Sequence, residues 1–180
     1  MAIIPPPPYG PPTPGDDDIL GTPQPDAIHA LAGNDRVFGL QGDDRLYGDA
    51  GDDVLDGGEG NDLLSGGDGD DILEGGSGDD RMIGGNGTDL MIGSEGNDIM
   101  YLANAGNRSQ GDGVADKVFF FSEEAGADKV YGFESGIDTV ELIGSEYTLT
   151  NNGRSSFLNF GSTTVTFYNE ILLDSDIITI

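Results

Sequence analysis

The chain has 180 residues, of which 34 are acidic and only 7 basic, so its formal net charge at pH 7 is −27. A chain with this charge is expected to repel nucleic acids and anionic membrane surfaces. Cysteine is absent, which excludes disulfides, zinc–thiolate sites and a cysteine nucleophile. No stretch is long and apolar enough for a transmembrane helix, so membrane insertion is not expected.

Proline dominates the beginning of the chain. The run Pro5 to Pro8 and the prolines at 11, 12 and 14 predict an extended N-terminal segment over residues 1–14. Residues 1–4 lack the basic start and sustained apolar run of a secretory signal peptide.

Residues 12–101 repeat a nine-residue unit ten times without insertion or deletion. The unit that begins at Gly57 reads Gly-Gly-Glu-Gly-Asn-Asp-Leu-Leu-Ser. The sixth position is aspartate in every unit, and the eighth is always apolar, as in Leu55, Leu64 and Leu73. A fixed period of this kind predicts a repeat architecture.

The unit suggests a turn followed by a strand. Glycine at positions one, two and four permits positive φ and a tight turn that presents carbonyl oxygens, and the aspartate adds charge. Calcium prefers six to eight such oxygen ligands in flexible geometry. Positions seven to nine predict a short strand with its middle residue inward. Two units would then form one coil, which predicts an all-β solenoid.

At these residues the chain resembles the RTX (hemolysin-type) calcium-binding repeat family, whose pattern is Gly-Gly-x-Gly-x-Asp-x-apolar-x. The resemblance implies a parallel β-roll in which each calcium lies between the turns of units n and n+2. Asp62 would pair with Asp80, with carbonyls of Gly58 and Gly60 below and of Gly75 and Ser77 above. Ten units would hold about eight calcium ions.

The resemblance assigns metal-binding roles to one aspartate and up to three glycines per unit. The aspartates are Asp17, Asp26, Asp35, Asp44, Asp53, Asp62, Asp71, Asp80, Asp89, Asp98 and Asp116. The glycines are Gly39, Gly42, Gly48, Gly51, Gly57, Gly58, Gly60, Gly66, Gly67, Gly69, Gly75, Gly76, Gly78, Gly84, Gly85, Gly87 and Gly93.

The units differ in how many of the three glycines of the pattern they contain. Those between Gly57 and Ile92 carry all three glycines and should bind best, whereas the first three units replace glycines with proline, threonine, leucine or alanine. These early units are expected to serve as a cap, which makes Asp17 and Asp26 weaker candidates. After a degenerate unit, Asp116 restores the pattern, and we expect it to pair with Asp98.

The boundary of the roll is predicted at residue 119, so that residues 15–119 form the roll and 120–180 a C-terminal cap. Segments 147–149, 157–160 and 165–168 predict short strands of an antiparallel meander stacked on the last coil. Residues 174–180, acidic and then apolar, resemble the uncleaved C-terminal signal of type I secretion substrates. A terminal edge strand is the alternative, and both can hold.

No catalytic constellation is visible, and His29, the only histidine, is expected to be solvated. One apolar side chain per unit cannot offset backbone entropy and charge repulsion, so we expect disorder without calcium. The resemblance implies a secreted, extracellular bacterial protein, exported through type I secretion machinery and not an enzyme. It would be a structural or binding module with a glycan or cell-surface partner.

Two other functions stay open. The chain could be a polysaccharide-binding accessory module, although its net charge argues against anionic polymers. It could also be the C-terminal part of a larger RTX enzyme or toxin. The outward aromatics Phe38, Tyr47 and Tyr101 suggest either a sugar-stacking stripe or simple packing against their neighbours.

Overall fold

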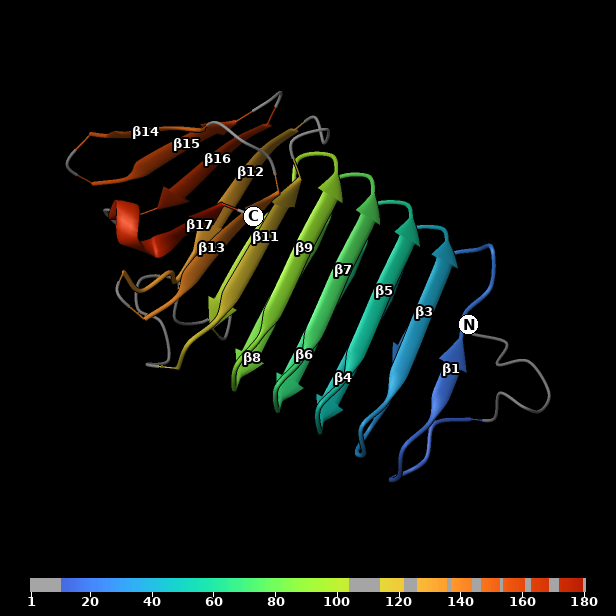
Figure 1. The fold of residues 1–180 in the computed structure, drawn as a ribbon. Helices are drawn as coiled ribbons and strands as arrows, with labels where there is room; N and C mark the ends of the chain where they lie inside the picture. Colours follow the sequence, from blue (N-terminus) through green and yellow to red (C-terminus); the bar gives the residue numbers. More distant parts are fainter. Residues whose placement is uncertain are drawn as a thin grey trace.

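The nine-residue period forms two parallel β-sheets that face each other across one narrow core, as the computed structural model shows (Figure 1). The structure describes residues 11–103, 114–121, 126–135, 137–143, 147–152, 154–160, 163–168 and 172–179. Most of the proline-rich segment and residues 104–113 lie outside this range. None of the described helices is long and apolar enough to span a membrane.

Successive units alternate between the two sheets, so each coil contributes one strand to each. Sheet A runs in the order β1 (Asp18–Leu20), β3 (Arg36–Gln41), β5 (Val54–Glu59), β7 (Ile72–Ser77), β9 (Leu90–Glu95), β11 (Lys117–Phe121), β13 (Thr139–Ile143) and β17 (Ile177–Thr179). Sheet B runs in the order β2 (Ala27–His29), β4 (Arg45–Ala50), β6 (Leu63–Asp68), β8 (Arg81–Asn86), β10 (Ile99–Ala103), β12 (Gly126–Tyr131), β16 (Thr163–Tyr168), β15 (Ser156–Phe160) and β14 (Tyr147–Asn151). The predicted all-β parallel roll with a C-terminal antiparallel region is therefore confirmed.

Neighbouring strands pair residues that are 18 apart, which is the two-unit coil expected from the sequence. Val54 pairs with Ile72, and Ile72 pairs with Leu90. The strands are longer than the predicted three residues, because pairing resumes after position one, as between Gly58 and Gly76. Most strands of the roll consequently span six residues, from position seven of one unit to position three of the next.

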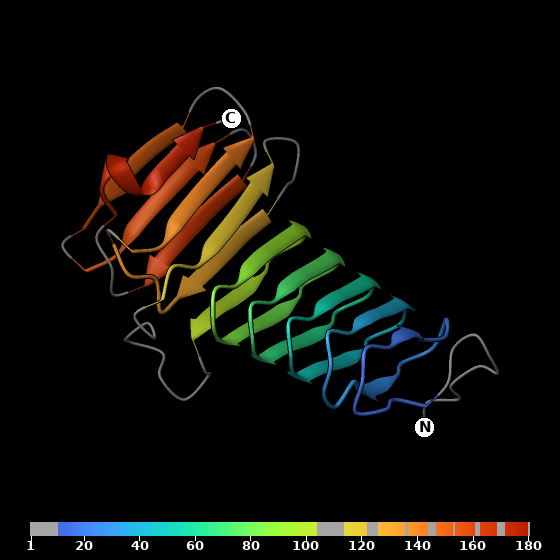
Figure 2. The same cartoon turned by 60° about the horizontal axis from the view of Figure 1, so that its bottom comes forward.

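The core is a double row of eighth-position side chains. Figure 2 shows the coils as flattened loops with one strand on each side. From Val37 to Met100 every eighth-position side chain has no exposed surface. Their burial provides the hydrophobic contribution of the roll, roughly 1.5–3 kcal/mol for each side chain.

Positive φ angles occur at positions two and four, as the glycines predict. Gly58 and Gly60 have φ angles of 100° and 145°. Position two also has positive φ where it is not glycine, at Leu31, Leu40, Asp49 and Ser94. A side chain in this conformation is strained, so these four turns are locally less stable than those with glycine.

The C-terminal region continues both sheets. Strands β14, β15 and β16 are antiparallel to one another, as predicted. The meander continues sheet B beyond the last coil, because β16 pairs in parallel with β12 as the strands of successive coils do, which agrees with the predicted stacking on that coil. Strand β17 pairs with β13 as the edge of sheet A, which confirms the predicted terminal edge strand.

Aromatic side chains fill the core at this end of the roll. Phe120 and Phe167 are completely buried, and Phe133 packs edge-on against Phe167 with ring centroids 5.1 Å apart. These rings belong to the same core cluster as the aliphatic side chains of the regular units.

Candidate metal centres

The sixth-position aspartates form two columns, one along each edge of the roll. The first column contains Asp17, Asp35, Asp53, Asp71, Asp89, Asp116 and Asp138, and the second contains Asp26, Asp44, Asp62, Asp80, Asp98 and Asp128. In both columns the backbone N–H of each aspartate donates to Oδ1 of the aspartate one coil further on, at 2.7 to 3.0 Å. One carboxylate oxygen is thus used to hold adjacent coils together.

The other carboxylate oxygen, Oδ2, is buried and accepts no hydrogen bond from the described residues at eight aspartates. These are Asp35, Asp44, Asp53, Asp62, Asp71, Asp80, Asp89 and Asp98. Burying a carboxylate oxygen away from water, without a hydrogen-bond donor or a cation, costs on the order of 1–3 kcal/mol or more. Repeated at eight consecutive units, this arrangement fits a column of cations rather than eight isolated packing defects.

The position-one glycine shows what surrounds each of these oxygens. A Cβ atom placed on Gly57 would collide with Oδ2 of Asp62 and would lie 2.6 Å from the carbonyl oxygen of Gly75. The Asp62 carboxylate therefore folds back toward its own unit and faces a carbonyl one coil further on. A Cβ on Gly39 or Gly48 would meet the corresponding carboxylate and carbonyl oxygens of its own site.

Burial changes the protonation of these carboxylates. Desolvation raises the pKa of Asp71 and Asp80 to about 7 and that of Asp98 to about 8. The hydrogen bond from the neighbouring backbone N–H opposes this shift, and the like charge of the adjacent aspartates adds to it. Without a cation these side chains would favour the protonated form near neutral pH.

The donor set suits a hard cation. Within the described ranges, no group of three histidine, cysteine, aspartate or glutamate side chains could hold a metal. The carboxylates stand in single file, so additional ligands would have to be backbone carbonyls. Oxygen-only sites of mixed carboxylates and carbonyls are typical of calcium. The Ser77 carbonyl, which the family pattern places among the ligands, accepts a hydrogen bond from Gly60 N–H at 2.9 Å.

The first two turns are built differently from the others. The backbone N–H and the hydroxyl of Thr13 donate to Oδ2 of Asp17, at 2.6 and 2.9 Å, and Thr22 binds Asp26 in the same way. Position two has no positive φ in these two units. Threonine thus supplies the donors that the eight later aspartates lack, which agrees with a capping role for this end.

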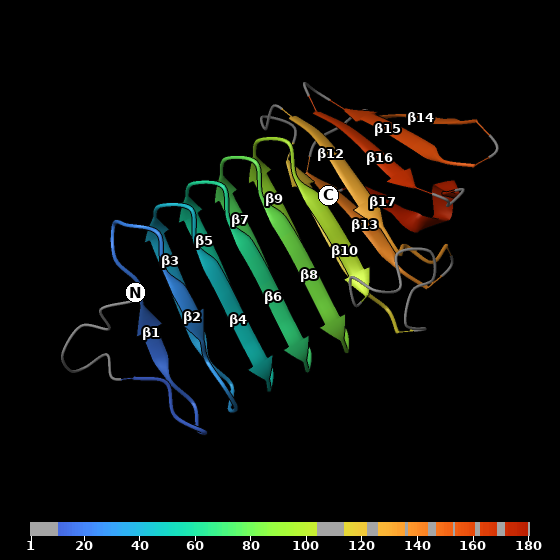
Figure 3. The same ribbon diagram turned by 180° about the vertical axis from the view of Figure 1, so that it is seen from behind.

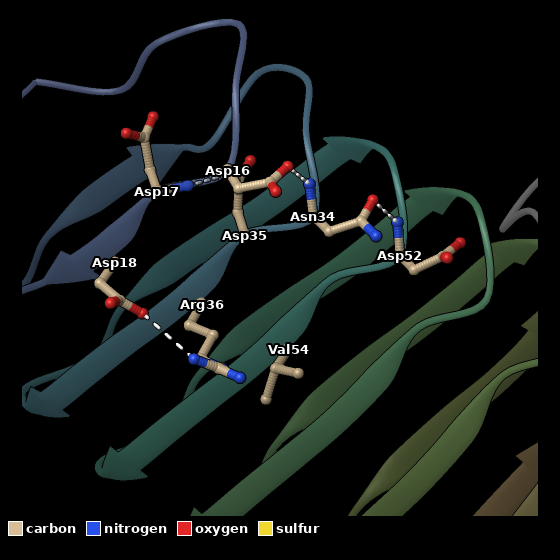
Figure 4. A pocket seen from close by; sticks show the side chains of 8 residues that line it. All are labelled: Asp16, Asp17, Asp18, Asn34, Asp35, Arg36, Asp52 and Val54. Carbon is tan, nitrogen blue, oxygen red and sulfur yellow. Dashed lines mark hydrogen bonds and ion pairs between the residues drawn. The ribbon is translucent and has the colours of Figure 1, made fainter.

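A second, exposed ladder runs outside each buried column. Figure 4 shows its start, where Asn34 N–H donates to Oδ1 of Asp16 and Asp52 N–H donates to Oδ1 of Asn34. Both contacts use position five, where asparagine or aspartate can serve as the acceptor because only a side-chain oxygen is needed. An aspartate of this exposed ladder acts as a hydrogen-bond acceptor, which asparagine can replace. An aspartate of the buried columns would also need its negative charge to bind a cation.

Toward the C-terminus the column partners differ from expectation. Asp116 aligns with Asp89, not with Asp98, and Asp98 aligns with Asp128. The 18 residues from Asp98 to Asp116 would make a full coil in the regular repeat. However, β10 lies in sheet B and β11, which follows Asp116, lies in sheet A, so Asp116 joins the first column and not the column of Asp98. Asp128-Lys129-Val130 repeats the Asp-x-apolar order, which leaves Asp128 open between a calcium ligand and a surface carboxylate on a strand-like turn. The structure buries Asp128 in the second column.

The proposed role of the buried aspartates can be tested at two adjacent positions. Asp71→Asn is expected to raise the calcium concentration needed for folding several-fold and to lower the number of bound calcium ions by one or two. Asp71 lies between Asp53 and Asp89 in its column, so its charge would serve two neighbouring ions. Calcium titrations by circular dichroism and equilibrium dialysis measure both effects.

The matched control is Asp70→Asn, which removes the same charge from the exposed ladder. Asp70 accepts from Thr88 N–H through Oδ1, an interaction that asparagine can reproduce. Its calcium midpoint should equal that of the wild type. Equal shifts in the two variants would mean that overall charge, not the buried column, controls calcium binding.

Comparison with known proteins agrees with this geometry. A model of the RTX calcium-binding nonapeptide repeat, four copies long, matches residues 13–46, 29–64, 38–73 and 65–100. No curated protein matches the sequence. Among solved structures, the extracellular lipase LipA from Serratia marcescens is similar at 16% identity with a TM-score of 0.38. That match covers 93% of this chain but only 39% of the lipase.

A second similar structure is the AlgE6R3 subunit of the Azotobacter vinelandii mannuronan C5-epimerase, at 20% identity and a TM-score of 0.24. The match covers 88% of this chain and 80% of the subunit. The match to the family model shows that residues 13–100 are RTX calcium-binding nonapeptide repeats, which fold here as a parallel β-roll.

Proposed function

We propose that this chain is a secreted β-roll module that folds when calcium fills its two columns of buried aspartates. The observation that carries this proposal is the series of eight buried Oδ2 atoms that accept no hydrogen bond from described residues. Between consecutive aspartates of a column, each ion would be held by carboxylates and turn carbonyls. The pairs would extend from Asp35 with Asp53 to Asp98 with Asp128, and the threonine-capped Asp17 and Asp26 would hold no ion through Oδ2.

Calcium would supply free energy that the chain does not contain. The folded roll buries a line of carboxylates at 0 to 3% exposure in a chain of formal charge −27. Burying like charges without counterions is unfavourable, and the apolar core has only one side chain per unit. Because the sites exist only in the folded roll, the free energy of calcium binding becomes free energy of folding.

This coupling would make folding depend on the compartment. RTX repeat proteins are generally secreted, extracellular bacterial proteins. Extracellular calcium modules bind with dissociation constants of about 10⁻⁴ to 10⁻³ M, so the chain would stay unfolded at cytoplasmic calcium concentrations and fold outside. Residues 174–180 would serve as the export signal for a type I secretion system and, after export, as strand β17 and its flank.

The module itself is proposed to bind or to support rather than to catalyse, since β-roll repeat modules are typically non-catalytic. The chain spans 39% of the length of the similar lipase. An enzymatic activity of a longer protein that contains this module is therefore a separate proposal, and the mass of the native secreted product tests it.

The decisive experiment is a calcium titration followed by far-ultraviolet circular dichroism, starting from calcium-free buffer. We expect a cooperative transition from coil to β-structure, with about eight calcium ions bound at saturation by equilibrium dialysis. Magnesium should not replace calcium, because it requires near-ideal octahedral geometry and retains its waters. The titration is carried out at alkaline pH, where the column carboxylates are ionised, and a chain that is already β-structured there without calcium would contradict the proposal.

Export is tested separately by expressing the full chain in cells with and without a type I exporter. The chain should reach the medium only when the exporter is present. Export that does not depend on the exporter would contradict this part of the proposal and leave the calcium dependence of folding untouched.

A further inference from the structure

The outward sides of the two sheets differ in charge. Positions seven and nine of each unit point away from the core, and on sheet A they include Asp18, Asp56, Glu74 and Glu141. On sheet B, from β2 through β12 to β16, the same positions include no acidic residue. Asp49, at position two of β4, is an outward carboxylate on this side, and it pairs with His29 of β2 at 3.0 Å. In a chain with 34 acidic residues, this side of the roll is distinct. Figure 3 shows it from the front.

Three cations stand on this side of sheet B. Arg45, Arg81 and Lys129 lie on β4, β8 and β12, and together with Tyr101, Tyr131 and Tyr168 they define what we call the cationic face. The cations occur on every second strand. Since adjacent strands are about 4.8 Å apart, successive cations along the roll are separated by roughly 9–10 Å.

The cations of the two sheets also differ in their partners. On sheet A, Arg36 pairs with Asp18 at 3.7 Å and Lys117 pairs with Glu141 at 2.8 Å, in each case across adjacent strands. On the cationic face, none of the three cations forms a salt bridge with a described residue. The positive charge of Lys129 favours the ionised form of Asp79 and Asp128, which by itself would lower the pKa of each carboxyl, but Lys129 forms no ion pair with either. These charges are therefore available to an external anion.

A ladder of aromatic rings supports the centre of this face. The Arg81 guanidinium lies 4.6 Å from the centre of the Tyr101 ring, Tyr101 stacks on Tyr131 at 5.1 Å, and Tyr131 stacks on Tyr168 at 4.7 Å. Tyr101 is only 5% exposed. Because neighbouring rings cover each other's faces, this ladder leaves little ring surface on which a sugar could stack. The rings also restrict Arg81, which favours binding with a low entropic cost.

We propose that the cationic face binds an extended polysaccharide that carries a carboxylate on about every second sugar. A flat face with cations at a regular spacing of roughly 9–10 Å fits a linear polymer whose charges are similarly sparse. Nucleic acid fits poorly, because duplex DNA carries one charge per roughly 1.7 Å of its axis. The partner class rests on the proposed function, since the face exists only in the folded roll.

The formal charge of −27 does not oppose this interaction on the cationic face. The carboxylates of the described residues stand mainly in the buried columns, on the exposed position-five ladders at the edges and on sheet A. On sheet B, Asp49 is paired with His29, and Asp68 accepts a hydrogen bond from the Asn86 side chain. Eight calcium ions would add 16 positive charges to the columns. Charges more than about 8 Å away are largely screened at physiological ionic strength, so the edges affect the middle of the face weakly.

The test measures binding to immobilised hyaluronan, which has one carboxylate per disaccharide, by surface plasmon resonance at saturating calcium. The variant carries Arg45→Gln and Lys129→Gln. The matched control carries Arg36→Gln and Lys117→Gln, which removes one arginine and one lysine from sheet A instead. We expect the first variant to bind about tenfold more weakly, equivalent to about 1.4 kcal/mol, and the control to change less than about twofold.

Dextran and duplex DNA serve as neutral and densely charged comparators, and neither should bind as well as hyaluronan. Equal losses in the two variants, equal or stronger binding of DNA, or no binding of the wild-type chain to hyaluronan would each overturn the proposal. Circular dichroism of every sample in calcium precedes the binding measurement. A chain that fails to fold in calcium contradicts the proposed function. A folded chain that does not bind hyaluronan contradicts only the binding role proposed for the cationic face.

Discussion

Replacing Gly57 by alanine is expected to prevent the roll from closing around its central calcium sites and to raise the calcium midpoint of folding at least tenfold. The new Cβ would collide with Oδ2 of Asp62 and would lie 2.6 Å from the carbonyl oxygen of Gly75. That carbonyl belongs to the backbone of the next coil, which is hydrogen-bonded on both sides and cannot rotate away. The coils would have to separate, and the Asp62 carboxylate would lose its position.

The control for this prediction is Gly15→Ala. Gly15 occupies position four of the first unit, has an ordinary φ angle, and has Thr13 Oγ1 at 4.0 Å as the nearest atom to a new Cβ. Its variant should keep the wild-type calcium midpoint and a melting temperature within a few degrees. Thermal melts and calcium titrations by circular dichroism compare the two. A Gly57→Ala protein that behaves like Gly15→Ala would show that the carbonyl and carboxylate around Gly57 do not form a binding cage.

The second large effect is a dependence of the calcium-free chain on pH. In calcium-free buffer we expect more β-structure at pH 5.5 than at pH 9. Burial raises the pKa of Asp44 and Asp53 to about 6, of Asp71 and Asp80 to about 7, and of Asp98 to about 8. Their ordinary value in an unfolded chain is 3.8.

The direction follows from proton linkage. Between pH 3.8 and the raised values, the folded chain holds protons that the unfolded chain has already released, so the free energy of unfolding decreases as pH rises. The decrease extends through pH 6 to 8, where these groups ionise in the folded state, and it ends above their pKa values. Protons would thus replace calcium in part by neutralising the buried columns.

The calcium-loaded chain provides the control. Bound cations would keep the carboxylates ionised, so its circular dichroism should be nearly constant over the same pH range. A calcium-free chain whose β-content rises with pH would contradict the expected burial of carboxylates. Measurements should remain above the isoelectric point near 4.1, where a chain without net charge tends to associate.

Much of the roll could be predicted from the sequence because its determinants are local. Gly58 and Gly60 permit the positive φ angles of one turn, Asp62 follows in the same turn, and Leu64 enters the core two residues later. A two-unit coil then requires pairing at a distance of 18 residues, which the structure confirms. The weaker first units were also recognisable, although the sequence pattern did not show that Thr13 and Thr22 bind the aspartates.

The end of the repeat was predicted less well. The count from Asp98 to Asp116 is that of a regular coil, yet β10 lies in sheet B and β11 in sheet A, so Asp116 aligns with Asp89 and Asp128 with Asp98. The meander was recognised by its alternation, but its attachment to β12 depends on pairing between segments more than 30 residues apart in sequence. Such pairing is chosen by the available sheet edge and not by the residues of the segment alone.

The sequence by itself determined the coil, the two aspartate columns and the character of the core, because each nine-residue unit contains its own turn, ligand and inward side chain. Only the tertiary structure decided which aspartates end the columns and which outward side chains become neighbours. Arg81, Tyr101, Tyr131 and Tyr168 lie far apart in sequence and meet because β8, β10, β12 and β16 are adjacent in sheet B. Net charge describes the whole chain, whereas hydrogen-bonded register determines where that charge is placed.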